Sequence, residues 1–332
     1  MATETEKPQR TTAVRKAPKK IEVVLGGGGV KGFAHIGFLR AIDKLNLNVG
    51  TVTGVSIGSI IAVLYVNGYS AEQIEVIFAE ELERINPKKL ARSMLLPAAL
   101  ARLLFKEEPV SLLAEMQELV RRYKLKPRTN LRLVAFNAVT RQPVVFSGRN
   151  YDLAAAMAAS CSIPIVFRPI ENGVEISLGN WAYKWAQARI GNEIKKRRRG
   201  GQKAAETVEA ETSLPTELLF DGGLYHPSPV DFCKGPAIIA RLGFARLPST
   251  DDLSFADKIF HKLEEMTSKY LDALFTDDLD DHYVLDVGRG DVAALSFGIS
   301  MRQRQALIDY GYKSTIKGLK KPIERGEIPL KS

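Results

Sequence analysis

A serine flanked by glycines is the first residue whose setting suggests chemistry. The run Gly54-Val55-Ser56-Ile57-Gly58 has the G-x-S-x-G pattern, and it lies between a short apolar strand at 51–53 and a strongly apolar helix at 57–66. Such a strand–turn–helix holds the serine hydroxyl out at the end of the sheet, near the positive end of the helix dipole. We therefore predict that Ser56 is a nucleophile and that Gly54 and Gly58 form its elbow. A plain glycine-rich turn would show the same pattern.

A serine nucleophile needs a general base, and the four histidines are poor candidates for it. The usual order after such an elbow is serine, acid, histidine, and His35 precedes the serine. His261 lies in a charged stretch that predicts a solvated helix. His226 lies close to an aspartate and His282 fits the usual order, but nothing around either one singles it out. A histidine base is therefore left open at this point.

An aspartate at the end of an apolar strand offers a base of another kind. Asp221 follows Leu218-Leu219-Phe220 and begins the turn Gly222-Gly223. A carboxylate that is partly shielded from water at a strand end can have its pKa raised toward the range that suits a base. We predict that Asp221 takes the proton of Ser56 directly. An ordinary Asp-Gly turn is the alternative.

A glycine-rich segment follows the first predicted strand, and its backbone N–H groups are suited to bind an anion. Gly27, Gly29 and Gly32 satisfy G-x-G-x-x-G between a strand and a helix, the usual context of a dinucleotide-binding loop. That pattern also needs an acidic residue near the end of the second strand, where Val52-Thr53-Gly54 has none. The same N–H groups would bind a tetrahedral oxyanion equally well. A tight turn that needs glycine only for its backbone angles is the third alternative.

The elements around these residues predict an α/β fold. A strand at 21–25 and a helix at 33–45 precede the strand and helix of the serine turn, and this alternation indicates a parallel sheet covered by helices. We expect a three-layer α/β/α arrangement with a mostly parallel central sheet, in one domain over residues 21–332. The other predicted elements are helices at 70–84, 111–123, 152–160, 254–275 and 302–319, and strands at 131–137, 143–146, 218–220 and 282–287. Ser70 with Gln73 predicts a capping box at the start of the first of these helices, and Asp152 is predicted to cap the third.

The charge of the chain is concentrated in two segments. Of the net charge of +9, the tail at 1–20 carries +4 and residues 178–219 carry +3. We expect the tail to be disordered and the basic insert, at about 178–215, to be a mobile loop. Basic residues outside a folded face argue against nucleic-acid binding, and they suit an anionic membrane surface.

Cysteine usage predicts a reducing compartment. Cys161 and Cys233 are too few for a disulfide framework and too far apart for a cysteine metal site. The N-terminus has no apolar core of a signal peptide, and no run reaches the ~18 apolar residues of a membrane span. We expect a cytoplasmic protein that is either soluble or peripheral at a membrane. Export by a route without such a signal, and the oligomeric state, are left open.

Four segments, in this order, resemble the blocks of the patatin-like phospholipase family. The blocks are a glycine-rich loop, a nucleophile serine, a small-residue–Pro–Phe–Pro segment and an Asp-Gly-Gly turn, and they match 27–37, 54–58, 159–169 and 221–230. The similarity spans residues 21–230, and the four blocks together are far more specific than any one of them. The chain departs from the pattern by an insertion of about 40 residues before Asp221, and by Tyr225-His226 in place of the frequent Asn of the last block.

The resemblance implies a lipid acyl hydrolase of the phospholipase A or lysophospholipase type. It implies acyl transfer from a lipid ester to Ser56 with Asp221 as the base, then hydrolysis, with no histidine, metal or cofactor. A nucleotide-binding oxidoreductase that uses the glycine loop, and a catalytically silent protein of the same fold, are the alternatives. The resemblance also places an oxyanion hole in the loop, whose residues are Gly27, Gly28, Gly29, Val30, Lys31 and Gly32.

Both tryptophans of the chain lie in the basic insert. Trp181 and Trp185 are four residues apart, so they share one face of any helix, and the basic run 195–199 follows them. Aromatic residues beside basic ones suit a helix that lies on an anionic bilayer. Two interpretations stay open: the rings contact a membrane, or they pack on the domain beside a solvated loop.

Overall fold

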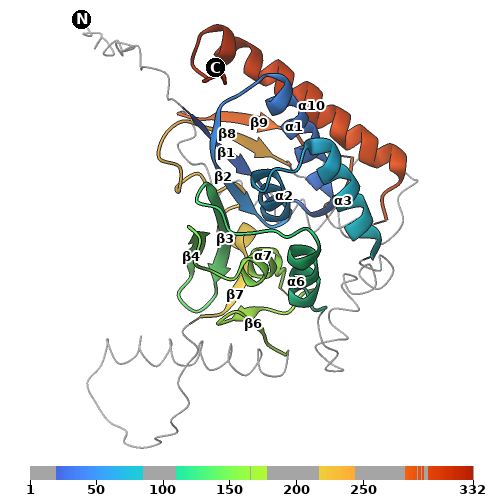
Figure 1. Ribbon diagram of the computed structural model, residues 1–332, viewed down its shortest axis with the longest axis vertical. Coiled ribbons are helices and arrows are strands. Elements are labelled where there is room, and N and C mark those ends of the chain that lie inside the picture. The colour runs from blue at the N-terminus through green and yellow to red at the C-terminus, as the bar shows by residue number, and fades with distance from the viewer. Residues whose placement is uncertain are drawn as a thin grey trace, which may run out of the picture.

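The central element of the protein is a nine-stranded sheet with the order β6-β5-β7-β3-β2-β1-β8-β9 and with β4 also paired to β3 (Figure 1). The computed structural model describes residues 20–84, 110–164, 166–177, 217–243, 281–289, 291–292, 294 and 298–331. Strands β3, β2, β1, β8 and β9 run parallel, whereas β4, β5, β6 and β7 pair antiparallel. This confirms the predicted, mostly parallel α/β sheet. The strands are β1 Ile21–Leu25, β2 Val49–Val55, β3 Leu131–Asn137, β4 Gln142–Ser147, β5 Ile170–Glu171, β6 Val174–Glu175, β7 Leu219–Asp221, β8 Ala237–Arg241 and β9 Tyr283–Asp286.

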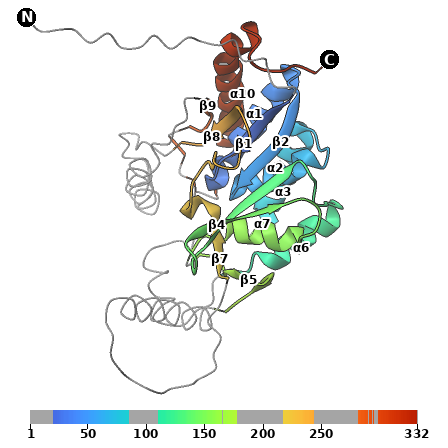
Figure 2. The same cartoon turned by 90° about the vertical axis from the view of Figure 1, so that its left-hand side faces the viewer.

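Helices cover one face of this sheet (Figure 2). On the opposite face, the segment that follows β7 contributes Val230, which packs with Val24 and Ile239. Of the two predicted helical layers, the described residues thus contain one. Its helices are α1 Phe33–Lys44, α2 Ile57–Val66, α3 Ala71–Arg84, α6 Leu113–Arg122, α7 Leu153–Cys161 and α10 Met301–Glu324.

Strand β1 lies between β2 and β8, and both of its faces are buried. Ile21, Val23 and Leu25 contribute to the large core under the helices, while Val24 belongs to the small cluster on the opposite face. Parallel strands buried on both faces read as continuous apolar runs, without the alternation of a half-exposed strand. This explains why the short run at 21–25 could be recognised as a strand.

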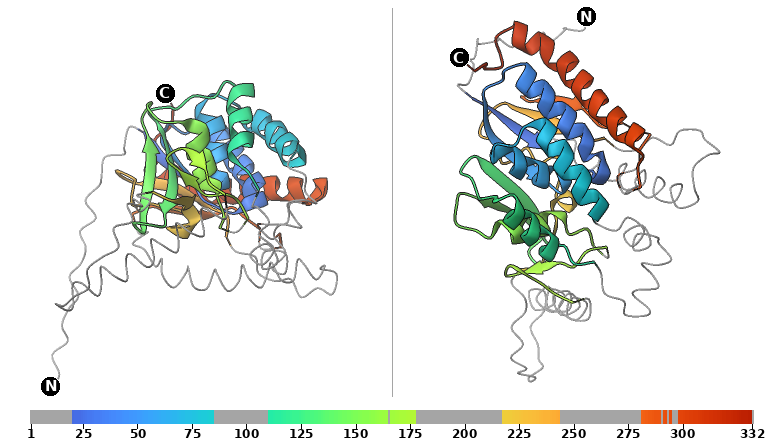
Figure 3. Two further views of the ribbon diagram at one scale, coloured as in Figure 1. Left: turned by 90° about the horizontal axis from the view of Figure 1, so that it is seen from below. Right: turned by 45° about the vertical axis from the view of Figure 1, so that its right-hand side comes forward.

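Helices α1 and α10 pack side by side in close contact (Figure 3). A Cβ atom on Gly37 would lie 1.9 Å from the carbonyl oxygen of Ile308, and one on Gly311 would lie 2.1 Å from that of Ala34. Only glycine therefore fits at these two positions. Helix α1 directly follows the glycine loop, so its close packing on α10 also fixes the position of the end of that loop.

Several local predictions are confirmed. The Ser70 N–H donates to Gln73 Oε1 at 2.9 Å and the Gln73 N–H donates to Ser70 Oγ at 3.3 Å, which is the predicted capping box of α3. Asp152 accepts from the Ala155 N–H at 3.0 Å and caps α7. Strand β2 is longer than the predicted 51–53. Its ladders with β1 and β3 include glycines of low strand propensity, because pairing on both sides outweighs that propensity.

Some predictions fall on residues outside the described ranges. These are the tail up to residue 19, the insert at 178–215 with Trp181 and Trp185, and the helix at 254–275. Within the described part of the chain, no helix is long and apolar enough to cross a membrane. In the same residues, no group of His, Cys, Asp and Glu side chains is placed to hold a metal ion.

Candidate active site

Ser56 occupies the turn between β2 and α2, in a backbone conformation that few side chains adopt. Its φ is 52° and its ψ is −128°. Such a conformation costs on the order of 1–3 kcal/mol and is found mainly at functional sites. The flanking glycines make room for it: a Cβ atom on Gly54 would lie 2.6 Å from Gly58 O, and one on Gly58 would lie 2.1 Å from Leu25 O. The turn therefore has the sharpness that the G-x-S-x-G pattern predicts.

Two further serines hold this turn in place. The Ser160 hydroxyl accepts from the Ser56 N–H at 3.0 Å and donates to Val134 O at 2.7 Å. The Ser59 hydroxyl donates to Ser56 O at 2.6 Å. The sequence reasoning did not assign Ser160 a role. The only available signal was its place in the small-residue segment that precedes the Pro–Phe–Pro block.

Asp221 lies at the end of β7 and is joined directly to Ser56. The Ser56 hydroxyl donates to Asp221 Oδ2 at 2.6 Å, across 165 residues of sequence. The other carboxylate oxygen, Oδ1, accepts from the Gly223 N–H at 2.7 Å, so the turn Gly222-Gly223 orients the side chain. A Cβ atom on Gly222 would lie 2.2 Å from Val134 O, so the turn can only be this close to β3 with glycine there.

Burial sets the acidity of this carboxyl group. Asp221 is 6% exposed and Ser56 is 8% exposed. Removal from water raises the pKa of Asp221 to about 6, from 3.8, against the opposing effect of the hydrogen bonds from Ser56 and Gly223. A pKa near the working pH is what a general base needs, because the group is then both ionised and basic.

The histidines take part in other contacts. His35 is fully buried, its Nε2 lies 2.8 Å from Gly26 O, and burial lowers its pKa to about 4. His226 Nδ1 accepts from the Ser228 N–H, and His282 Nδ1 accepts from the Ala237 N–H. Among the described residues, none of these rings bonds to the Ser56 hydroxyl, and His261 lies outside the described ranges. The geometry thus favours the aspartate over a histidine.

The glycine loop lies against Ser56, but most of its N–H groups are already in use. A Cβ atom on Gly27 would lie 3.3 Å from Ser56 Cβ. The Gly27 N–H donates to Pro227 O, the Val30 N–H to Ala294 O and the Lys31 N–H to Gly28 O. Within the part of the chain that the structure describes, the N–H groups of Gly28 and Gly29 have no acceptor.

The remaining loop residues hold the loop in shape. Lys31 is fully buried, and its Nζ donates to Gly243 O at 3.0 Å. Gly29 has a φ of 54°, and a Cβ atom there would lie 2.0 Å from Ala294 O. A Cβ atom on Gly32 would lie 2.6 Å from Ile57 Cγ1 at the start of α2. Of the six predicted residues, Gly28 and Gly29 are thus the ones whose N–H groups have no acceptor within the described residues, while the contacts of Gly27, Gly32 and Lys31 hold the loop in place.

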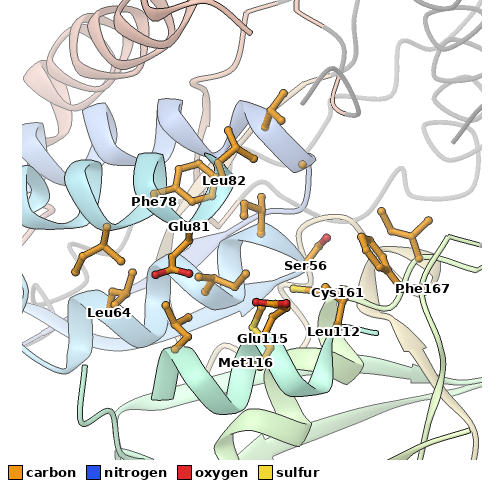
Figure 4. Close-up of a pocket in the computed structure, with 17 residues that line it drawn as sticks. Ser56, Leu64, Phe78, Glu81, Leu82, Leu112, Glu115, Met116, Cys161 and Phe167 are labelled. Carbon is orange, nitrogen blue, oxygen red and sulfur yellow. The ribbon is translucent and has the colours of Figure 1, made fainter. Parts of the chain in front are cut away.

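An apolar pocket opens beside Ser56 between α2, α3 and α6 (Figure 4). Ser56 lies between Leu64 on one side and Phe167 on the other, and Phe78 and Met116 project into the pocket from α3 and α6. Glu81 and Glu115 are the charged side chains among its described lining residues. A nucleophile, a carboxylate beside it, two N–H groups without an acceptor among the described residues and an apolar pocket can together hold and cleave an ester with a hydrophobic acyl group.

The chain matches a family model described as patatin-like phospholipase over residues 23–234. Among curated proteins, the lysophospholipase NTE1 of Pyricularia oryzae is 45% identical over 53 residues, which are 16% of this chain and 4% of that protein. Patatin-like phospholipase domain-containing protein 6 of Homo sapiens is 47% identical over 53 residues, again 16% of this chain and 4% of that protein. The match spans only a small part of these relatives' own length.

Two solved structures were also similar over most of the chain. The crystal structure of VipD from Legionella pneumophila has a TM-score of 0.45 and 15% identity, and covers 92% of this chain and 67% of VipD. The crystal structure of the type III effector protein ExoU has a TM-score of 0.38 and 17% identity, and covers 92% of this chain and 53% of ExoU. On the family match, which includes the serine, the aspartate and the glycine loop, the chain belongs to the patatin-like phospholipase family.

Proposed function

We propose that this chain hydrolyses fatty acyl esters of lipids, as a phospholipase A or a lysophospholipase, with Ser56 as nucleophile and Asp221 as base. The observation that carries the proposal is the 2.6 Å hydrogen bond between the buried Ser56 hydroxyl and Asp221 Oδ2, next to two N–H groups without an acceptor in the described part of the chain. The lysophospholipase and phospholipase names of the relatives support the lipid ester as substrate class.

The first half of the reaction transfers the acyl group to the protein. Ser56 Oγ attacks the carbonyl carbon of the ester while Asp221 Oδ2 accepts the hydroxyl proton. The carbonyl oxygen becomes an oxyanion, which the N–H groups of Gly28 and Gly29 stabilise, and the N-terminus of α2 adds its positive dipole end. When the tetrahedral intermediate collapses, Asp221 returns the proton to the leaving alkoxide, and the lipid alcohol departs from acyl-Ser56.

The second half releases the fatty acid. A water molecule attacks the acyl-Ser56 carbonyl carbon and gives its proton to Asp221, and the same two N–H groups bind the oxyanion again. Collapse breaks the bond to Ser56 Oγ, which takes the proton back from Asp221. One carboxylate thus moves a proton in both halves, so neither a histidine nor a metal takes part.

The dyad is tested by measuring ester hydrolysis with the wild type and with the Ser56→Ala, Asp221→Asn and Ser147→Ala variants. The substrates are a lysophosphatidylcholine, a phosphatidylcholine and a soluble p-nitrophenyl ester. We expect Ser56→Ala and Asp221→Asn to lower kcat by roughly 10³-fold or more. Ser147→Ala should match the wild type, because Ser147 is an exposed serine at the end of β4.

The outcomes separate the alternative functions. Hydrolysis that survives Ser56→Ala would contradict the mechanism. A wild type without activity on any ester would favour a catalytically silent protein. Fluorescence of a nicotinamide cofactor bound to the glycine loop would favour the oxidoreductase, for which β2 lacks the acidic ribose ligand.

We further propose that the protein is cytoplasmic and binds membranes peripherally through its basic insert. The i, i+4 spacing of Trp181 and Trp185 would place both rings on one face of a helix, and the basic run 195–199 follows them in the sequence; this combination suits an anionic bilayer surface. Sedimentation with vesicles that contain anionic lipid tests the proposal. Changing both tryptophans to alanine should weaken binding, whereas equal binding by the wild type and the double variant would contradict it.

A further inference from the structure

We propose that the pocket beside Ser56 is an acyl-chain site of limited length, so that the preferred substrates are esters of medium-chain fatty acids. This proposal rests on the proposed acyl hydrolase function and adds its substrate class. It follows from the way in which three helices line the pocket, from the tyrosine pair that follows the last lining residues of two of them, and from the charged side chains beside it.

Helix α2 forms the floor of the pocket and carries the nucleophile at its start. Ile57, Ile60 and Leu64 line it, and their spacing of three and four residues places them on one face of the helix. Ile57 and Ile60 are only partly buried, while Leu64 is fully buried. An acyl group on Ser56 Oγ can therefore extend over the two isoleucines and reach Leu64.

Helices α3 and α6 form the walls. From α6, Met116 and Leu119 line the pocket, and the preceding Leu112 belongs to the same face. From α3, Phe78 and Leu82 lie opposite. All five side chains are apolar, so each methylene group that enters exchanges water for hydrocarbon contact.

A pair of tyrosines follows the last residues of α2 and α6 that line the pocket, Leu64 and Leu119. Tyr69 lies between α2 and α3 and donates its backbone N–H to Leu64 O at 3.3 Å. Tyr123 directly follows α6, and its carbonyl oxygen accepts from the Tyr69 hydroxyl at 2.9 Å. The two rings meet edge to face with centroids 6.0 Å apart. The C-terminal ends of α2 and α6 are thereby tied to the start of α3, directly beyond Leu64.

The length of the floor limits the length of the chain. Ile57 and Leu64 are seven residues apart, or about 10 Å at the helical rise of 1.5 Å per residue. The wall gives the same value, because Leu112 and Leu119 have the same spacing. An extended polypeptide backbone spans about 3.6 Å over the three bonds of a residue, so an extended carbon chain advances roughly 1.2 Å per bond. A pocket about 10 Å long therefore accepts about nine carbons.

Charged side chains make it unfavourable for a longer acyl chain to leave the pocket between α3 and α6. Glu81 lines it, and Arg122 bonds to this carboxylate at 2.5 Å. Glu115 lines it as well and is exposed to solvent. An alkyl chain that turned out between α3 and α6 would remove water from these charged groups, which is unfavourable.

These features predict a defined profile of rate against chain length. One buried methylene contributes about 0.8 kcal/mol, which is about fourfold in kcat/KM if it is bound in the transition state. We expect kcat/KM to rise by about this factor per methylene from short acyl chains up to about nine carbons and then to level off or fall. Palmitate esters should therefore be no better than decanoate esters.

The experiment measures kcat/KM for p-nitrophenyl esters from acetate to palmitate, each kept below its aggregation concentration. The variants are Ile60→Phe, which fills the middle of the pocket, and Val76→Phe, which adds a similar ring on the exposed face of α3. In Ile60→Phe the rise should stop at about five carbons, with a loss on the order of 100-fold for octanoate. A far-UV circular dichroism spectrum and a urea-unfolding midpoint that match those of the wild type show that the variant folds. Val76→Phe should keep the wild-type profile.

Two results would overturn the proposal. One is a wild-type rate that keeps rising to palmitate, and the other is an Ile60→Phe profile parallel to that of the wild type. Both results concern the length of the acyl chain and leave the role of Ser56 untouched. The proposed function has its own test, because it fails if Ser56→Ala still hydrolyses acetate. A wild type that hydrolyses acetate only with Ser56 intact, but whose rate keeps rising up to palmitate, would thus keep the proposed function and remove the length limit.

Discussion

Replacement of Asp221 by asparagine should change the stability of the protein as well as its activity. Burial raises the pKa of this carboxyl group from 3.8 to about 6. One pKa unit corresponds to about 1.36 kcal/mol, so ionisation of the buried group costs about 3 kcal/mol of folding free energy. This value is an upper bound for the gain in the variant, because asparagine also loses the charge-assisted hydrogen bond from Ser56.

The sign of the pH dependence follows from the two protonation states. Below pH 4 the carboxyl is protonated in both the folded and the unfolded chain, so its contribution to stability is fully present. Between about pH 4 and pH 6 the unfolded chain has lost the proton while the folded protein still holds it. The free energy of unfolding contributed by Asp221 therefore falls by about 3 kcal/mol as the pH rises through this window.

Urea unfolding of the wild type and Asp221→Asn at a series of pH values measures this directly. The stability of the variant relative to the wild type should grow by about 3 kcal/mol from pH 4 to pH 7, because asparagine does not titrate. In the same window, kcat/KM of the wild type on a soluble ester should rise with a midpoint near pH 6, since the base must be ionised. A stability difference that is constant with pH would refute the assigned pKa and its cause.

Two further substitutions test the support of the nucleophile. Ser160→Ala leaves the Ser56 N–H without its acceptor, so it should cost about 1–3 kcal/mol in urea unfolding and lower kcat more than it changes KM; unchanged kcat would show that Ser160 does not position the turn. Gly58→Ala would place a Cβ atom 2.1 Å from Leu25 O, and we expect it to destabilise the protein by roughly 3 kcal/mol or more. Gly235→Ala, with no atom within 4 Å of its Cβ position, should stay within about 0.5 kcal/mol of the wild type, so equal effects of the two would contradict the steric argument.

Local features of the fold could be predicted because they depend on neighbours in sequence. The capping box at Ser70 and the cap at Asp152 join residues three apart, and both are present. The short strands β5 and β6 were not predicted, since two residues carry no periodicity. The glycines at 50 and 54 also obscured the true ends of β2, which pairing with β1 and β3 determines.

In the site, too, features with a local sequence pattern could be predicted, and features that depend on distant residues could not. Ser56 and the glycine loop have local signatures, but no local pattern joins Ser56 to Asp221 across 165 residues. The roles of the loop N–H groups could not be read from the sequence either. Which of them are free depends on carbonyl groups of Pro227 and Ala294, far along the chain. The pocket likewise arises only when the apolar faces of α2, α3 and α6 meet.

The proposed role of Asp221 as the base accounts for the burial of the site. Both oxygens of Asp221 accept a hydrogen bond, Oδ2 from the Ser56 hydroxyl and Oδ1 from the Gly223 N–H, and each bond lowers the pKa. In a solvated position these bonds would leave the group ionised but too weak a base to take the serine proton. In a fully dry position without them it would stay protonated at neutral pH. The combination of 6% exposure with two hydrogen-bond donors brings the pKa of Asp221 to about 6. This is close to the ordinary pKa of an imidazole, so the carboxylate can take the place of the histidine base of other sites.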